Sequence, residues 1–216
     1  MIYKFNFISF LLLSSQVLAN YTTVTVLDPK LAAIEGVVVY LSPLDKSSVN
    51  SHTTQTLIIS QNNKKFTPYI AVLQKGQKIK FKNQDDVTHH IYSVSGQNRF
   101  DFKVKAGGHK DNINISTAGE IAMGCNIHDW MSGYVLVVDT PYFNKTTSSG
   151  ISNFENIPSG NYKLTIWHPQ LETNNNEFVT DIMIQKTQNF KVTLPKALLP
   201  IPVQQNQDEF DFLEGY

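Results

Sequence analysis

The sequence contains one cysteine, Cys125, among its 216 residues, and it has no excess of charge of either sign. A single cysteine excludes an intrachain disulfide framework. Lysine plus arginine and aspartate plus glutamate each number 18, so no overall electric field favours nucleic acid or an anionic membrane as a partner. Convincing helical patterns are also missing. Instead, Val, Ile, Thr, Phe and Tyr recur in short runs between Asn, Gly, Pro and Ser, which predicts an all-β fold.

Apolar runs long enough to span a bilayer are absent as well, so we expect no transmembrane anchor. A short apolar stretch at residues 7–13 follows Lys4 and precedes the small-residue sequence Val17-Leu18-Ala19. This pattern is typical of a cleaved secretory signal and predicts that residues 1–19 direct export, with a periplasmic location for the mature protein. An unpaired thiol in an oxidising compartment is a liability unless it is buried, paired between chains or bound to metal.

Turn residues, Gly133 among them, divide the middle of the chain into short segments. We expect eight strands there, at residues 56–60, 69–73, 78–82, 89–94, 100–104, 112–115, 120–124 and 134–138. In the third of these, Ile79 and Phe81 alternate with lysines and should point to one face of the strand. Further strand patterns occur upstream, at 22–27 and 36–41, and downstream of Pro141.

The segment with the clearest chemistry is residues 124–133, GCNIHDWMSG, which places a thiolate, an imidazole and a thioether within seven residues in a predicted loop between two strands. These donors together suit copper that cycles between two oxidation states. Zinc favours a second thiolate or a carboxylate, and the segment offers only Asp129. The missing donor should be a histidine from another strand, and both His89 and His90 stand at the start of one. Met123 is a rival thioether, although it precedes the cysteine on a strand.

These motifs resemble the cupredoxin family. The spacing Cys-x-x-His-x-x-Met at Cys125, His128 and Met131, with an upstream Asn-x5-His at Asn83 and His89, is similar to that of plastocyanin. The two residues between histidine and methionine make it most similar to amicyanin. The strings HHIYS and GCNIHDWM look closer still to bacterial plastocyanin-like proteins labelled methylamine utilisation proteins. The resemblance implies a Greek-key β-sandwich with one mononuclear copper ion.

Applied to this chain, the resemblance implies a role for each matching residue. Cys125 would form the short copper–thiolate bond, and His89 and His128 would complete a trigonal plane around the metal. Met131 would be the long axial ligand, and Asn83 would brace the ligand loops by hydrogen bonds.

The sequence departs from the family pattern at position 90, where His90 stands in place of the usual asparagine. Because side chains alternate along a strand, only one of two adjacent histidines can point inward. The spacing from the upstream asparagine favours His89 as the ligand and leaves His90 beside the site.

The flanking regions have a resemblance of their own. Residues 22–42 and 146–168 look like the opening and the continuation of a carboxypeptidase-regulatory or transthyretin-like sandwich. We therefore expect a discontinuous second β-sandwich built from residues 21–45 and 141–196, with a cupredoxin-like domain at 55–139 between its two parts. The polar residues 45–55 would form a linker, and the acidic residues 200–216 a disordered tail.

The expected function is that of an exported blue-copper electron-transfer protein and not of an enzyme. Four protein ligands on one copper leave no position for a substrate, and copper oxidases need a further metal site that six scattered histidines do not supply. The expected partner is a periplasmic dehydrogenase or cytochrome in transient contact. Two alternatives stay open: a periplasmic copper-binding chaperone, and a β-sandwich interaction module in which Cys125 is merely buried.

Overall fold

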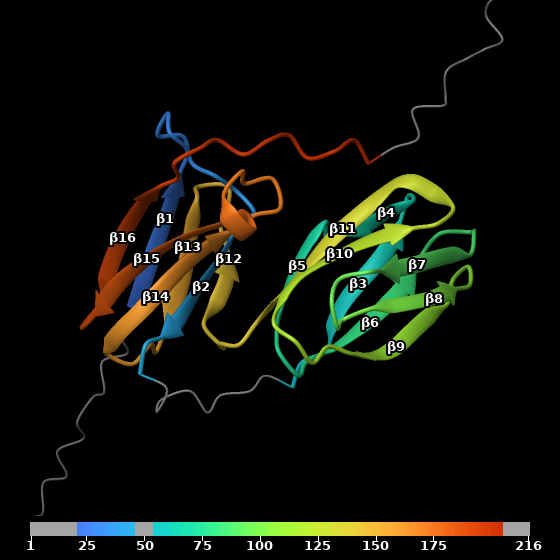
Figure 1. The fold of residues 1–216 in the computed structure, drawn as a ribbon, viewed down its shortest axis with the longest axis horizontal. Helices are drawn as coiled ribbons and strands as arrows, with labels where there is room; N and C mark the ends of the chain where they lie inside the picture. The colour runs from blue at the N-terminus through green and yellow to red at the C-terminus, as the bar shows by residue number, and fades with distance from the viewer. Residues whose placement is uncertain (1–20, 46–53, 205–216) are drawn as a thin grey trace, which may run out of the picture.

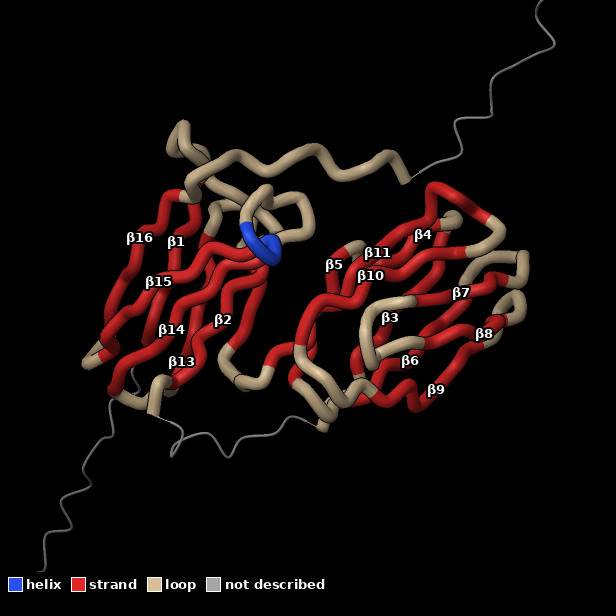
Figure 2. Tube along the Cα trace, viewed as in Figure 1, coloured by secondary structure: helices blue, strands red, loops and turns tan. Residues whose placement is uncertain are grey.

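The computed structural model describes residues 21–45 and 54–204, which form two β-sandwiches side by side (Figures 1 and 2). Its strands make four sheets, and the helical structure among the described residues is one 3-10 turn, Asn174–Asn176. The prediction of an all-β fold is therefore confirmed. The expected signal at 1–19, most of the expected linker and the end of the acidic tail lie outside the described residues. Within the described ranges, no helix is long and apolar enough to cross a membrane.

The first sandwich, here called the site sandwich, contains strands β3 to β11. Its larger sheet has the strand order β5-β11-β10-β7-β8, and its smaller sheet has the order β4-β3-β6-β9. The strands are β3 (Leu57–Asn62), β4 (Lys65–Thr67), β5 (Ile70–Gln74), β6 (Lys78–Asn83), β7 (His89–Ser93), β8 (Phe100–Val104), β9 (His109–Asn114), β10 (Gly119–Cys125) and β11 (His128–Val138).

Alternation of apolar and polar side chains explains which faces of these two sheets form the core. In β6, Ile79 and Phe81 share one face, as predicted, and are fully buried, while Lys80 on the other face forms an ion pair with Asp111. The apolar residues of the inner faces form one continuous cluster, and it also contains Cys125. The thiol therefore lies at the boundary between the hydrophobic core and the end of the sandwich.

The second sandwich, here called the flanking sandwich, is built from the chain on both sides of the first. Its sheets have the orders β13-β1-β16 and β12-β2-β14-β15. Its core contains Val24 and Val26 from one sheet and Leu164 and Ile166 from the other. The strands are β1 (Tyr21–Leu27), β2 (Val38–Pro43), β12 (Phe143–Lys145), β13 (Ile151–Glu155), β14 (Gly160–Trp167), β15 (Glu177–Ile184) and β16 (Gln188–Thr193).

Strands that precede and follow the site sandwich in sequence pair with one another. β2 lies between β12 and β14, and β1 lies between β13 and β16, which runs parallel to it. The chain thus leaves the flanking sandwich after β2, forms the site sandwich, and returns with β12 (Figure 1).

A third apolar cluster joins the two sandwiches. The side of β5 and β11 that faces away from the site core packs against β2 and the end of β14, and the buried residues of this contact are Val38, Ile70, Leu136, Val138 and Trp167. Polar contacts reinforce it, since Lys145 Nζ donates to the carbonyl oxygen of Ile70 at 3.0 Å, and Asn176 Nδ2 donates to a carboxylate oxygen of Glu120 at 2.9 Å.

Several segments differ from what the sequence indicated. β11 begins at His128 instead of near Tyr134, so the histidine and methionine of the motif lie on the strand, and the turn is reduced to two residues. An irregularity between Gly124 and Cys125 allows this, because it sets Cys125 opposite His128. Residues 200–204, expected as the start of a disordered tail, run back toward the site sandwich, where Gln204 Nε2 donates to Ser132 Oγ at 3.0 Å.

Candidate metal centre

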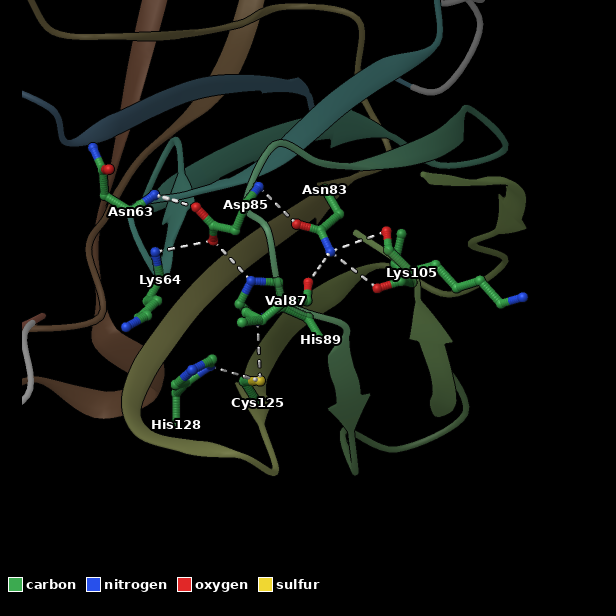
Figure 3. Close-up of polar contacts among 10 residues, drawn as sticks. Asn63, Lys64, Asn83, Asp85, Val87, His89, Lys105, Cys125 and His128 are labelled. Carbon is green, nitrogen blue, oxygen red and sulfur yellow. Dashed lines mark hydrogen bonds and ion pairs between the residues drawn. The ribbon is translucent and has the colours of Figure 1, made fainter. Parts of the chain in front are cut away.

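Three side chains of the kinds that can bind a metal meet at one end of the site sandwich (Figure 3). His89 begins β7, Cys125 ends β10 and His128 begins β11. Cys125 Sγ lies 3.6 Å from His89 Nδ1 and 3.6 Å from His128 Nδ1, and the donor atoms of the three lie within 4.8 Å of one another. Their exposed fractions are 0%, 4% and 8%, so the cluster is almost closed to solvent.

Strand pairing brings these residues together. β10 runs antiparallel to β7 with Cys125 opposite Ile91, and the same cysteine pairs with His128 across the turn to β11. The N–H of Asn126, in that turn, donates to the carbonyl oxygen of His90 at 3.0 Å, which ties the turn to β7. Backbone geometry therefore fixes the three donors relative to one another.

Two glycines on these strands allow close approach of neighbouring aromatic rings. A Cβ atom at Gly124 would lie 2.7 Å from the Tyr92 ring, so the absent side chain lets that ring cross β10 beside Cys125. Gly133, which the sequence indicated as a turn residue, lies inside β11, where an added Cβ atom would lie 3.1 Å from Phe66. That interpretation of Gly133 was wrong, because the residue continues strand β11 and packs closely against Phe66.

Both candidate thioethers lie in the core that contains the thiol. Met131, on β11, is 1% exposed, and Met123, on β10, is 4% exposed. Both belong to the same buried cluster as Cys125. A surface hollow of about 400 Å³ reaches this region and is lined by both methionines, Cys125, Tyr92 and Asn126, among others.

The two adjacent histidines face opposite sides of β7. His90 Nε2 lies 2.6 Å from an oxygen of the exposed Asp101 carboxylate, and His90 Nδ1 lies 2.9 Å from Asn126 Nδ2. The structure thus places His89 beside Cys125 and His90 on the outer face, in contact with the turn that follows the cysteine.

Asn83 ties together the segments around the start of β7. Its Nδ2 lies within hydrogen-bond distance of the carbonyl oxygens of Val87, Val104 and Lys105, at 2.7, 3.0 and 3.1 Å, and its Oδ1 accepts from the N–H of Asp85 at 2.9 Å (Figure 3). One amide group thereby holds the loop between β6 and β7 against the end of β8.

Sequence reasoning missed Asp85. One carboxylate oxygen, Oδ2, lies 2.8 Å from His89 Nε2, on the side of the ring away from Cys125. The side chain is 9% exposed and also accepts the N–H groups of Asn63 and Lys64, at 2.6 and 3.0 Å. A carboxylate four residues before a buried histidine was the available signal, but Asp86 beside it made the choice ambiguous from sequence.

The hydrogen bonds of this cluster favour its charged forms. Burial opposes ionisation of Cys125 and Asp85, but hydrogen bonds with His89 and with backbone groups outweigh it and lower the pKa of both. Burial also acts to lower the pKa of His89, yet its hydrogen bonds with Cys125 and Asp85 raise that pKa overall. Burial, and then the charge of His89, lower the pKa of His128.

This donor set fits a copper ion. Two imidazoles present Nδ1 to a buried, unpaired thiol that can ionise, which combines soft sulfur and nitrogen donors at one point. Residues 32–137 match the family model described as a cupredoxin-like domain.

The chain therefore contains a cupredoxin-like domain.

The predicted resemblance is confirmed, and with it the expectation of one mononuclear copper site. The match begins upstream of the site sandwich and includes β2, which the structure places in the flanking sandwich.

Several solved structures are similar to parts of this chain. A purple cupredoxin from Nitrosopumilus maritimus is 20% identical, with a TM-score of 0.34, over 38% of this chain and 99% of that one. A copper(I) amicyanin variant is 16% identical, with a TM-score of 0.36, over 46% of this chain and 98% of that one. A copper-containing nitrite reductase from Thermus scotoductus is 21% identical, with a TM-score of 0.37, over 54% of this chain and 28% of that one. Among curated proteins, no relative matches the sequence.

Proposed function

We propose that this protein is an exported blue-copper electron carrier and that His89, Cys125, His128 and Met131 hold its copper. The observation that carries the proposal is the meeting of the two Nδ1 atoms with Cys125 Sγ in a nearly closed pocket. Bound copper would supply a one-electron couple. We assign the axial position to Met131 and not to Met123, because Met131 stands three residues after His128 on the strand that the histidine begins.

The chain's own contribution would be to keep the donors in place. Cys125 and His128 face each other across paired strands, and Asn83 holds the loop that leads to His89. A site braced in this way changes little between oxidation states, which favours fast electron transfer. The low exposure of all four proposed ligands leaves little room for a substrate, and we therefore propose a carrier in preference to an enzyme.

A partner would approach at the turn next to His128. Ile127 in that turn is 52% exposed, and the Trp130 ring centroid lies 5.2 Å from that of His128. This small apolar rim suits a brief encounter with a periplasmic dehydrogenase or cytochrome. Because the chain has no net charge, partner binding should depend only weakly on salt.

Export is proposed on the sequence of residues 1–19. The carrier role is tested by voltammetry of the copper-loaded protein, followed by stopped-flow mixing with a reduced periplasmic dehydrogenase or cytochrome. A reversible one-electron wave and rapid reoxidation of the partner are expected. Catalytic consumption of oxygen or nitrite would indicate an enzyme, and irreversible cycling with release of copper would indicate a chaperone.

A further inference from the structure

The Asp85 carboxylate lies behind His89, on the side of the ring opposite to Cys125 (Figure 3). It is nine-tenths buried, and its contacts are a ring nitrogen and two backbone N–H groups. Burying a carboxylate is costly unless donors surround it, so this arrangement needs every one of its partners to donate.

The contacts decide which nitrogen of His89 carries the proton. An ionised carboxylate is an acceptor only, and its two oxygens already accept from Asn63 and Lys64. At 2.8 Å, His89 Nε2 must therefore donate. The one proton of the neutral imidazole is then on Nε2, and the lone pair is on Nδ1, the atom that faces Cys125.

The carboxylate is itself held from the opposite sheet. Asn63 and Lys64 form the two-residue turn between β3 and β4, with φ angles of 53° and 54°, as in a tight type I′ hairpin. Their N–H groups point at Asp85, and Asn83 Oδ1 accepts from the Asp85 N–H. The smaller sheet thus sets the position of a ligand that belongs to the larger one.

We propose that Asp85 is a positioning residue that fixes His89 in the Nε2–H tautomer with Nδ1 directed at the metal, and that its charge favours copper(II) over copper(I). This rests on the proposed ligand role of His89. An anionic acceptor behind a ligating histidine raises the basicity of the ring, and a negative charge near the metal stabilises the more positive ion.

The chain offers a matched control. Asp101 makes the same kind of contact with His90, at 2.6 Å, but this pair lies on the outer face of β7. Asp85→Asn and Asp101→Asn remove the same charge in isosteric form, and only the first acts on the proposed ligand. Three measurements separate them: copper(II) affinity, copper(I) affinity, and the ¹⁵N NMR tautomer of His89 in the metal-free protein.

Asp85→Asn should lower copper(II) affinity about 10- to 100-fold and copper(I) affinity less, because contacts behind a metal ligand have effects of about this size. Each factor of ten by which the loss of copper(II) affinity exceeds the loss of copper(I) affinity raises the reduction potential by about 59 mV. Asp101→Asn should leave both affinities and the potential unchanged. In the metal-free wild-type protein, the neutral His89 ring should be the Nε2–H tautomer, and Asp85→Asn should give a tautomer mixture.

The proposal is overturned if wild-type His89 is the Nδ1–H tautomer, or if folded Asp85→Asn retains wild-type affinities and potential. Far-UV circular dichroism shows whether the variant is folded. If it is not, the wild-type tautomer decides alone. A wild-type protein that binds no copper would contradict the proposed function, whereas the tautomer of its metal-free form would still test Asp85.

Discussion

His89 Nδ1 lies 3.6 Å from Cys125 Sγ, although 36 positions separate the two residues in the sequence. The pairing of β7 with β10 produces this contact, and the turn after Cys125 adds His128 to it. Cys125 and His128 are therefore close together in the sequence, whereas the position of His89 depends on the register between β7 and β10. A shift of that register by one residue would turn His89 outward and His90 inward.

His89→Ala should abolish or grossly alter the copper site, because it removes a buried nitrogen donor that faces the thiol. His90→Ala should change the visible and electron paramagnetic resonance spectra only mildly, since His90 contacts the turn residue Asn126 and not the donors. The two variants are compared in these spectra after copper loading. The opposite ranking would mean that the register of β7 is wrong by one residue.

Much of this architecture could be predicted from local patterns. The alternation in β6 placed Ile79 and Phe81 on one face, which the structure buries, and the spacing after Cys125 identified a soft donor set. The length of β11 was missed because the two-residue turn at 126–127 depends on a strand irregularity that no local propensity encodes.

Long-range contacts account for the rest of what the sequence did not reveal. Asp85 acquires its role only when the β3–β4 turn lies across the sandwich from it, and Gly133 acquires its role only when Phe66 packs on β11. Neither contact has a periodic signature. Such features follow from tertiary packing, which sequence patterns near the residue do not contain.

Gly124→Ala should destabilise the protein by about 1–3 kcal/mol, because the added methyl group would overlap the Tyr92 ring. Removing the ring with Tyr92→Ala should relieve the overlap, so the double variant should lose less stability than the sum of the two single changes. Gly160→Ala is the control, since its Cβ atom would meet an ordinary contact at 3.7 Å. Urea unfolding of these variants measures the coupling between positions 124 and 92. If the losses of stability in the two single variants added up to the loss in the double variant, the predicted overlap would be contradicted.

His168 should make stability fall as the solution becomes acidic. Burial lowers its pKa from 6.5 to about 4, so the folded protein resists a proton that the unfolded chain accepts. Stability should be fully present above about pH 6.5 and should decrease by on the order of 3 kcal/mol as the pH falls to 4.

His168→Asn removes this titration and keeps an acceptor for the N–H of Gln170, which now donates to His168 Nδ1. Urea unfolding of both proteins at pH 7.5 and pH 5 isolates the contribution of the ring. If the two proteins lost the same free energy of unfolding between these values, a neutral buried His168 would be excluded.

We propose that the two sandwiches, residues 21–45 with 141–196 and residues 55–139, are separate folding units joined by the cluster around Trp167. Trp167→Ala should leave a cavity in this contact and cost about 3–5 kcal/mol. Calorimetry should then resolve two transitions where the wild-type protein shows one. A single transition in the folded variant would mean that the two sandwiches unfold as one unit without this contact.

The most direct test of the copper site is a titration of the metal-free protein with copper(II), followed by visible absorption, for the wild type and for Cys125→Ser. The wild-type protein should develop an intense thiolate-to-copper band that saturates at one equivalent, because Cys125 is the one thiol in the chain. Cys125→Ser should keep the far-UV circular dichroism of the wild type and show no such band. A wild-type protein without the band, or a serine variant that retains it, would contradict the assignment of Cys125 as the copper ligand.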